Sequence, residues 1–213
     1  MPIIYKKKFN SGLKLGVWKI IETNEQLFDK LVLSDAELIH VKKINHSKRY
    51  KHWLASRVLI KDLLQTDEFI QFEYDDYGKP NLVNVSGYIS ISHAADVAAI
   101  ALSPDNHVGI DIERMQAKIE RIAPKFMLKE EIASCTEENK IRDMYIHWCV
   151  REAVYKCYGK RQLDFRKHML LQPINRNLSQ QLEVKLVRSN IDYKYLVSID
   201  EIGDYMLAYT QHK

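Results

Sequence analysis

The run Val108-Gly109-Ile110-Asp111-Ile112-Glu113 alternates apolar residues with a glycine and two acids. A period of two is typical of a β-strand, because successive side chains point to opposite faces. The run therefore predicts a strand that buries its apolar residues and carries Asp111 and Glu113 on an exposed face, about 7 Å apart. Two acids on one rigid face favour a site for a hard divalent cation. The solvated side of an ordinary strand has the same pattern.

A second charged run lies downstream, Trp148-Cys149-Val150-Arg151-Glu152-Ala153-Val154-Tyr155-Lys156. Trp148, Glu152 and Lys156 are spaced i, i+4, i+8 and so share one stripe of a predicted helix. A third carboxylate can therefore face the two acids of the strand. The alternative is an exposed Glu–Lys ion pair, which contributes a few tenths of a kcal/mol.

Two shorter motifs come before these runs, Tyr77-Gly78-Lys79-Pro80 and Tyr88-Ile89-Ser90-Ile91-Ser92-His93-Ala94. Taken alone, the first is explained by a hairpin connection and the second by an apolar strand that ends in a structural histidine. Their occurrence in fixed order with the two charged runs is not expected by chance.

In this order the four motifs resemble those of the surfactin-type 4′-phosphopantetheinyl transferases. The resemblance extends from about Arg49 to Gly159, and Phe126-Met127-Leu128-Lys129-Glu130-Glu131 is similar to the Phe-Phe-x-x-x-Glu segment of that family. Three positions depart from the family pattern: Met127 replaces the second Phe, Ala94 follows the histidine where Ser is frequent, and Arg151 replaces a commoner Lys. Arg151 keeps the cation, and we expect it to reach a phosphate or to face solvent.

The resemblance implies an enzyme that moves the phosphopantetheine arm of coenzyme A to a serine hydroxyl of an apo carrier protein and releases 3′,5′-ADP. The carrier would be an acyl, peptidyl or polyketide carrier in fatty acid or secondary metabolite biosynthesis. Coenzyme A would be the substrate and Mg²⁺ the cofactor.

The same resemblance implies a metal site made of Asp111, Glu113 and Glu152. Mg²⁺ suits such a site because it prefers oxygen ligands and completes its octahedron with water and substrate phosphate. Glu152 is also the candidate catalytic base. Since a carboxylate on Mg²⁺ is a weak base, Glu152 acts through a metal-bound water or another acid such as Glu131 takes the proton.

The residues expected to bind coenzyme A are Lys79, Ser92, His93, Lys156 and Arg57. Lys156 and His93 are also catalytic candidates, Lys156 as a partner of the leaving phosphate and His93 as a donor to phosphate when charged. The basic cluster from Lys42 to Arg57 is the expected seat of the 3′-phosphate. Arg57 is preferred within it because its helix should be anchored in the core.

The composition agrees with a globular enzyme: 213 residues, 46% of them hydrophobic, with a formal net charge of +4. The sequence has no run of about 18 apolar residues, and its N-terminal charges follow the apolar residues, opposite to the order in a signal peptide. We therefore expect a cytoplasmic monomer without membrane contact, with Cys135, Cys149 and Cys157 reduced. A P-loop and zinc-finger spacing are absent, so nucleic-acid binding is not expected. The alternative function is another Mg²⁺-dependent phosphoryl enzyme, such as a nucleotide hydrolase.

The order of the elements predicts an α+β fold with two similar lobes, residues 1–107 and 108–213, each a small, mostly antiparallel sheet packed with helices. The resemblance implies that a pseudo-twofold axis relates the lobes. The predicted helices are Asn24–Leu33, Ser34–Lys43, Tyr50–Leu64, Lys129–Ser134 and Glu138–Tyr158. The predicted strands are Leu15–Ile21, Phe69–Tyr74, Gly87–Ser92, Val97–Leu102, Val108–Glu113, Met169–Leu171, Leu182–Val187, Tyr193–Ile199 and Tyr205–Thr210.

Overall fold

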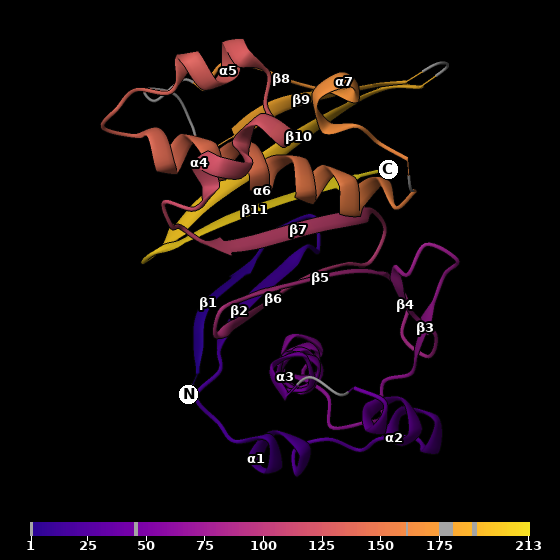
Figure 1. Ribbon diagram of the computed structural model, residues 1–213. Coiled ribbons are helices and arrows are strands. Elements are labelled where there is room, and N and C mark those ends of the chain that lie inside the picture. Colours follow the sequence, from indigo (N-terminus) through magenta and orange to yellow (C-terminus); the bar gives the residue numbers. More distant parts are fainter. Residues whose placement is uncertain (1, 45–46, 161, 175–180, 189–190) are drawn as a thin grey trace.

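The strand predicted from the first run exists as β7 (His107–Arg114), at the edge of a five-stranded antiparallel sheet. A computed structural model describes residues 2–44, 47–160, 162–174, 181–188 and 191–213. Within these residues the fold is α+β, with antiparallel sheets packed with helices (Figure 1). The predicted fold class is confirmed, whereas the division at residue 108 and the pseudo-twofold axis stay predictions.

The first sheet has the order β1-β2-β6-β5. Its strands are β1 (Ile3–Lys8), β2 (Lys14–Lys19), β5 (Tyr88–Ala94) and β6 (Val97–Ser103). The long helix α3 (Ser47–Leu64) packs against β2 and β6, with the short helices α1 (Asn24–Phe28) and α2 (Asp35–Lys42) beyond it (Figure 1). A capping box begins α2, since Ser34 and Glu37 bond each other's backbone. A two-stranded hairpin, β3 (Phe72–Tyr74) and β4 (Pro80–Leu82), lies beside β5.

The second sheet has the order β7-β11-β10-β9-β8. Its other strands are β8 (Met169–Leu171), β9 (Gln181–Arg188), β10 (Ile191–Ile202) and β11 (Tyr205–His212). The helix α6 (Lys140–Tyr158) packs across β7, β11 and β10 and ends at Gly159, whose φ of 73° suits a helix terminus. The shorter helices are α4 (Ile119–Ile122), the 3₁₀ turn η1 (Ala123–Lys125), α5 (Lys129–Ser134) and α7 (Phe165–His168). Among the described residues, no helix is both long and apolar enough to cross a bilayer.

Several elements differ from the sequence prediction. The strands β1 and β4 and the short helices α4 and α7 were not predicted, and α1 ends at Phe28 rather than Leu33. These segments are short, so their own sequence carries little periodicity.

The two faces of β7 are both covered, which corrects the expected exposed face. Val108, Ile110 and Ile112 lie in a core shared with the first sheet, while Asp111 is only 4% exposed. The face that carries Asp111 was expected to meet solvent, but α6 covers it. An alternating pattern identifies the two faces of a strand but not what lies on each.

Gly109 explains how α6 can lie so close to β7. A Cβ atom at this position would stand 1.8 Å from the backbone oxygen of Ala153 and 2.7 Å from the backbone nitrogen of Cys157. Only a residue without a side chain fits there. The glycine of the first run is therefore required for the packing of helix on strand.

The two sheets are joined at their edges by serine side chains. Strands β5 and β7 are edge strands, and the Ser90 and Ser92 hydroxyls of β5 accept hydrogen bonds from the backbone N–H groups of Ile110 (3.1 Å) and Ile112 (3.3 Å) of β7. These bonds satisfy buried donors that would otherwise lack a strand partner. We call this contact the serine seam.

We expect Gly109→Ala to destabilise the protein by at least about 3 kcal/mol, because the helix backbone must move away from the strand. Gly16→Ala is the matched control, since a Cβ there meets only the flexible ends of the Leu59 and Leu63 side chains. Its loss should stay under about 1.5 kcal/mol. Urea unfolding measures both values, and equal losses would contradict the proposed close packing.

Candidate active site

The helix α6 places its predicted stripe over the acids of β7. Lys156 donates from Nζ to Asp111 Oδ1 (2.7 Å) and to Ser92 Oγ (2.9 Å), while Ser92 Oγ donates to the same carboxylate oxygen (2.8 Å). Three of the candidate residues thus form one hydrogen-bonded cluster. Its members come from β5, β7 and α6, so the cluster depends on both the serine seam and the close approach at Gly109.

The other two acids are electrostatically coupled to this cluster. Burial, followed by the charge of Asp111, raises the pKa of Glu113 to about 7. The charges of Lys118 and Lys156 and a hydrogen bond from Trp148 oppose this rise. Burial and the charge of Asp111 likewise raise the pKa of Glu152 to about 7, with Lys156 opposing. Glu113 also contributes to the shift of Glu152. The carboxylates therefore share one desolvated region and repel one another.

The donor chemistry of this region fits Mg²⁺. All three candidate ligands are carboxylates, and Asp111 Oδ2 is buried without a hydrogen-bond partner. A buried acceptor in this state is usually satisfied by a hydrogen-bond donor or a cation. However, among the residues that the structure describes, no three or more His, Cys, Asp or Glu side chains converge as a formed metal centre. The ligand set of Asp111, Glu113 and Glu152 stays a prediction.

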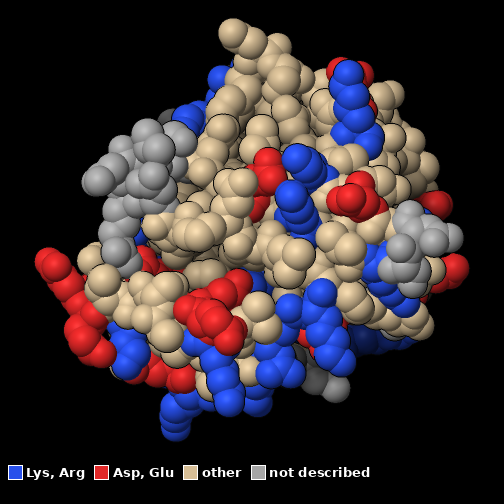
Figure 2. Space-filling model, turned by 90° about the horizontal axis from the view of Figure 1, so that it is seen from above, with Lys and Arg blue, Asp and Glu red and all other residues tan. Residues whose placement is uncertain are grey.

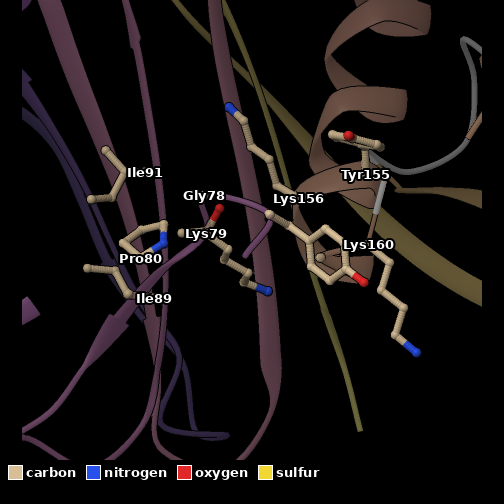
Figure 3. Close-up of a pocket in the computed structure, with 11 residues that line it drawn as sticks. Gly78, Lys79, Pro80, Ile89, Ile91, Tyr155, Lys156 and Lys160 are labelled. Carbon is tan, nitrogen blue, oxygen red and sulfur yellow. The ribbon is translucent and has the colours of Figure 1, made fainter. Parts of the chain in front are cut away.

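A cavity of about 200 Å³ lies between the β3–β4 turn, β5 and the C-terminal end of α6 (Figure 3). Lys79, Lys156 and Lys160 line it together with Tyr155, so three lysines from two separate segments border one space. Positive charges from converging elements favour an anionic ligand.

The turn that carries Lys79 is organised by Asp75. Its Oδ1 accepts hydrogen bonds from the backbone nitrogens of Tyr77 (2.9 Å) and Lys79 (2.8 Å), and Gly78 has a φ of 84°. Lys79 Nζ donates to the last-turn carbonyl of Cys157 (3.3 Å), and burial lowers the pKa of Lys79. The hairpin connection and the placement of Lys79 in the cavity are thus both present.

His93 stands at an exposed position with one ring face against His52, the ring centroids being 4.4 Å apart. Partial burial, followed by the charge of His52, lowers the pKa of His93 to about 4. At this pKa the ring is neutral at neutral pH in the ligand-free chain, and its contact with phosphate stays a prediction. A neutral imidazole keeps one N–H donor for phosphate.

Arg151 neither reaches a phosphate nor faces solvent, so both expectations for it are wrong. Its guanidinium is fully buried and donates through Nη2 to both carboxylate oxygens of Glu131, at 2.6 and 2.8 Å. Glu131 also accepts from the backbone nitrogen of Leu128 at the start of α5. Because its carboxylate is held in this structural pair, the surroundings of Glu131 do not favour a role as base.

Arg57 lines a separate cavity of about 410 Å³ beside α2, α3 and β3. Its guanidinium lies over the rings of Trp53 (3.9 Å) and Phe72 (4.3 Å), and Nε is 4.0 Å from Glu37 Oε1. An acid and two aromatic rings thus already surround this cation. Arg57 Nε and Glu37 Oε1 nevertheless have no hydrogen-bond partner among the described residues, and the contact of Arg57 with the 3′-phosphate stays a prediction.

Several site residues were missed by sequence reasoning. Ser90 of the seam, His52 beneath His93, and Tyr155 and Lys160 at the cavity were not proposed as site residues. The i, i+2 spacing of Ser90 and Ser92 could have indicated that both hydroxyls face one neighbour. His52 had no such signal, because its partner is distant in sequence.

Comparisons of the sequence with known proteins point to one family. The model of the 4′-phosphopantetheinyl transferase superfamily matches residues 107–210. A "Putative 4'-phosphopantetheinyl transferase" of Synechocystis sp. is 27% identical over 142 residues, covering 61% of this chain and 58% of that protein. A protein of the same name from Haemophilus influenzae is 29% identical over 150 residues, covering 63% and 62%. The match thus spans less than two thirds of the length of either relative.

In metal-free buffer, Glu152→Gln should stabilise the protein at high pH. The pKa of Glu152 is about 7 in the folded chain against an ordinary 4.5, so the folded state holds a proton that the unfolded chain releases. Stability is therefore lost as pH rises through about 7, and the variant should unfold a few degrees higher than native at about pH 8 but not at about pH 4.5. The exposed acid Glu130 supplies the control Glu130→Gln. Thermal unfolding with chelator measures the difference, and a less stable Glu152→Gln protein at pH 8 would contradict it.

Proposed function

We propose that this chain, whose residues 107–210 match the 4′-phosphopantetheinyl transferase superfamily, transfers the phosphopantetheine arm of coenzyme A to a serine of an apo carrier protein. The observation that carries the proposal is the Ser92–Asp111–Lys156 cluster at the edge of a lysine-lined cavity. Acids beside fixed cations are what phosphoryl transfer from a diphosphate requires.

In the proposed reaction, the serine hydroxyl oxygen of the carrier bonds to the phosphorus of the pantetheine phosphate. The bond from this phosphorus to the bridging oxygen breaks, and 3′,5′-ADP leaves with the electron pair. Lys79 and Lys156 supply positive charge around the diphosphate, and both line the same cavity. His93 donates a hydrogen bond to phosphate as a neutral imidazole.

The serine proton must pass to a base, for which Glu152 is the proposed residue. A base is most effective when its pKa lies near the working pH, and that of Glu152 is about 7 in the ligand-free chain. Asp111, Glu113 and Glu152 would hold Mg²⁺, which when bound neutralises charge on the diphosphate. As the base, Glu152 would leave the metal to Asp111 and Glu113, because a carboxylate bound to Mg²⁺ is a weak base.

The proposed partner is an acyl, peptidyl or polyketide carrier, and the protein would act as a cytoplasmic monomer. Its surface does not identify the carrier by charge alone. Lys and Arg side chains lie among Asp and Glu on the face seen in Figure 2, in keeping with the modest net charge of +4. A mixed surface favours recognition by shape and several local contacts over attraction by one strong field.

Incubation with coenzyme A, Mg²⁺ and several apo carriers should add one phosphopantetheine to a carrier, as read by intact mass. Asp111→Asn should lower the rate by at least about a hundredfold, because the cluster loses the charge on which Lys156 and the metal depend. Asp105→Asn, in the exposed turn before β7, is the matched control and should transfer normally. Breakdown of coenzyme A without modification of any carrier would instead favour a hydrolase.

Lys156→Ala should reduce transfer at least about a hundredfold, whereas Lys160→Ala should cost less than about tenfold. Both lysines line the cavity, but Lys156 also bonds Asp111 and Ser92 while Lys160 is exposed. The comparison separates the effect of a positioned charge, that of Lys156, from the general positive potential to which Lys160 contributes. Steady-state kinetics measure both transfer rates. Equal small losses would indicate that Lys156 forms only an ordinary ion pair.

A further inference from the structure

His52 is a buried polar residue that the proposed reaction does not use directly. It lies on α3 and is 5% exposed, and its Nε2 is 3.0 Å from the carbonyl oxygen of Ala95. A carbonyl only accepts, so Nε2 carries the proton and Nδ1 is bare in the neutral ring. One tautomer and one ring orientation are thereby selected.

The carbonyl that His52 holds belongs to the turn directly after His93. Ala95 has a φ of 49°, a left-handed conformation that non-glycine residues rarely adopt. The next residue, Asp96, pairs with Lys19 (2.6 Å) and accepts a hydrogen bond from Tyr205. Contacts on both sides therefore keep the turn in this disfavoured shape and hold the end of β5 in place.

His52 also contacts the His93 ring itself. The two imidazoles are stacked, with centroids 4.4 Å apart and planes 17° from parallel. Because one face of His93 is covered, rotation about its side-chain bonds is restricted while the other parts of the ring stay exposed.

The charges around the pair favour two neutral rings. Burial and the charge of Lys48 lower the pKa of His52, whereas the hydrogen bond to Ala95 and the charge of Asp96 raise it. Burial, His52 and Lys156 lower the pKa of His93, whereas a backbone hydrogen bond and the charge of Asp111 raise it. Burial is the largest of these effects for both rings, and it holds the pKa of each imidazole below its usual range.

We propose that His52 is a positioning residue that, through its stacked ring, orients His93 toward the phosphates of coenzyme A. The inference rests on the proposed transferase function. A histidine that served only the core would affect stability, whereas a positioning residue acts on substrate binding through His93.

His52→Ala should raise the KM for coenzyme A about tenfold, the value of one well-placed hydrogen bond, with kcat and the KM for carrier nearly unchanged. His52→Phe keeps a ring against His93 and should retain most of the native KM. His52→Gln keeps a donor near Ala95 without the ring and should behave as His52→Ala does. A native KM for coenzyme A in His52→Gln together with a raised KM in His52→Phe would overturn the proposed role of the stacked ring.

Ser56→Ala is the matched control. Ser56 is buried one turn further along α3 and donates to the His52 carbonyl (2.8 Å), so this change loosens the same helix without removing the ring. Its KM for coenzyme A should be native. In addition, the double variant His52→Ala with His93→Ala should be no worse than His93→Ala alone, whereas additive losses would overturn an action through His93.

A titration by NMR tests the positioning without any transfer assay. In the native protein the His93 ring should stay neutral between about pH 7.5 and 5.5, whereas in His52→Ala it should titrate in that range because the covering ring is gone. Unchanged titration of His93 in His52→Ala would overturn the inference. Failure of native protein to modify any carrier would overturn the transferase proposal but leave this result interpretable.

Discussion

The close contact of α6 with β7 at Gly109 is the constraint on which the site depends. With no side chain at Gly109, the helix backbone approaches to a distance that any Cβ would prevent. This approach brings Lys156 within hydrogen-bonding distance of Asp111. The serine seam fixes the other side of β7, so that Ser92 can join the same carboxylate. A helix held further from the strand would leave the acids solvated and unconnected.

The same constraint has an electrostatic cost. Burial raises the pKa of both Glu113 and Glu152 to about 7, so the ligand-free cluster is unfavourable when fully ionised. The pair of Arg151 and Glu131 makes an instructive contrast, because it too is buried but has matched charges and two short hydrogen bonds. A satisfied pair indicates a structural role, whereas like charges buried together are the surroundings in which we propose a functional site.

Sequence periodicity predicted the elements of the site well, because their patterns are local. The alternation around Asp111 gave β7, and the spacing of Glu152 and Lys156 gave one stripe of α6. The same patterns could not show what covers each face, so the burial of Asp111 was not foreseen. The surroundings of Arg57 were also unpredictable, since Glu37 and Phe72 approach it from other elements. A count of positive charges along the chain does not show which side chains surround each of them.

The family match covers residues 107–210, but the site does not lie within those residues alone. Ser92 belongs to β5, and Lys79 belongs to the hairpin turn, yet they bond respectively to Asp111 of β7 and to the Cys157 carbonyl of α6. Residues outside the matched range therefore contribute to the candidate site. Since Ser92 also accepts from the Ile112 backbone, the contact that joins the sheets is the contact that completes the site. Changes that loosen the sheet interface should consequently act on the site before they unfold either sheet.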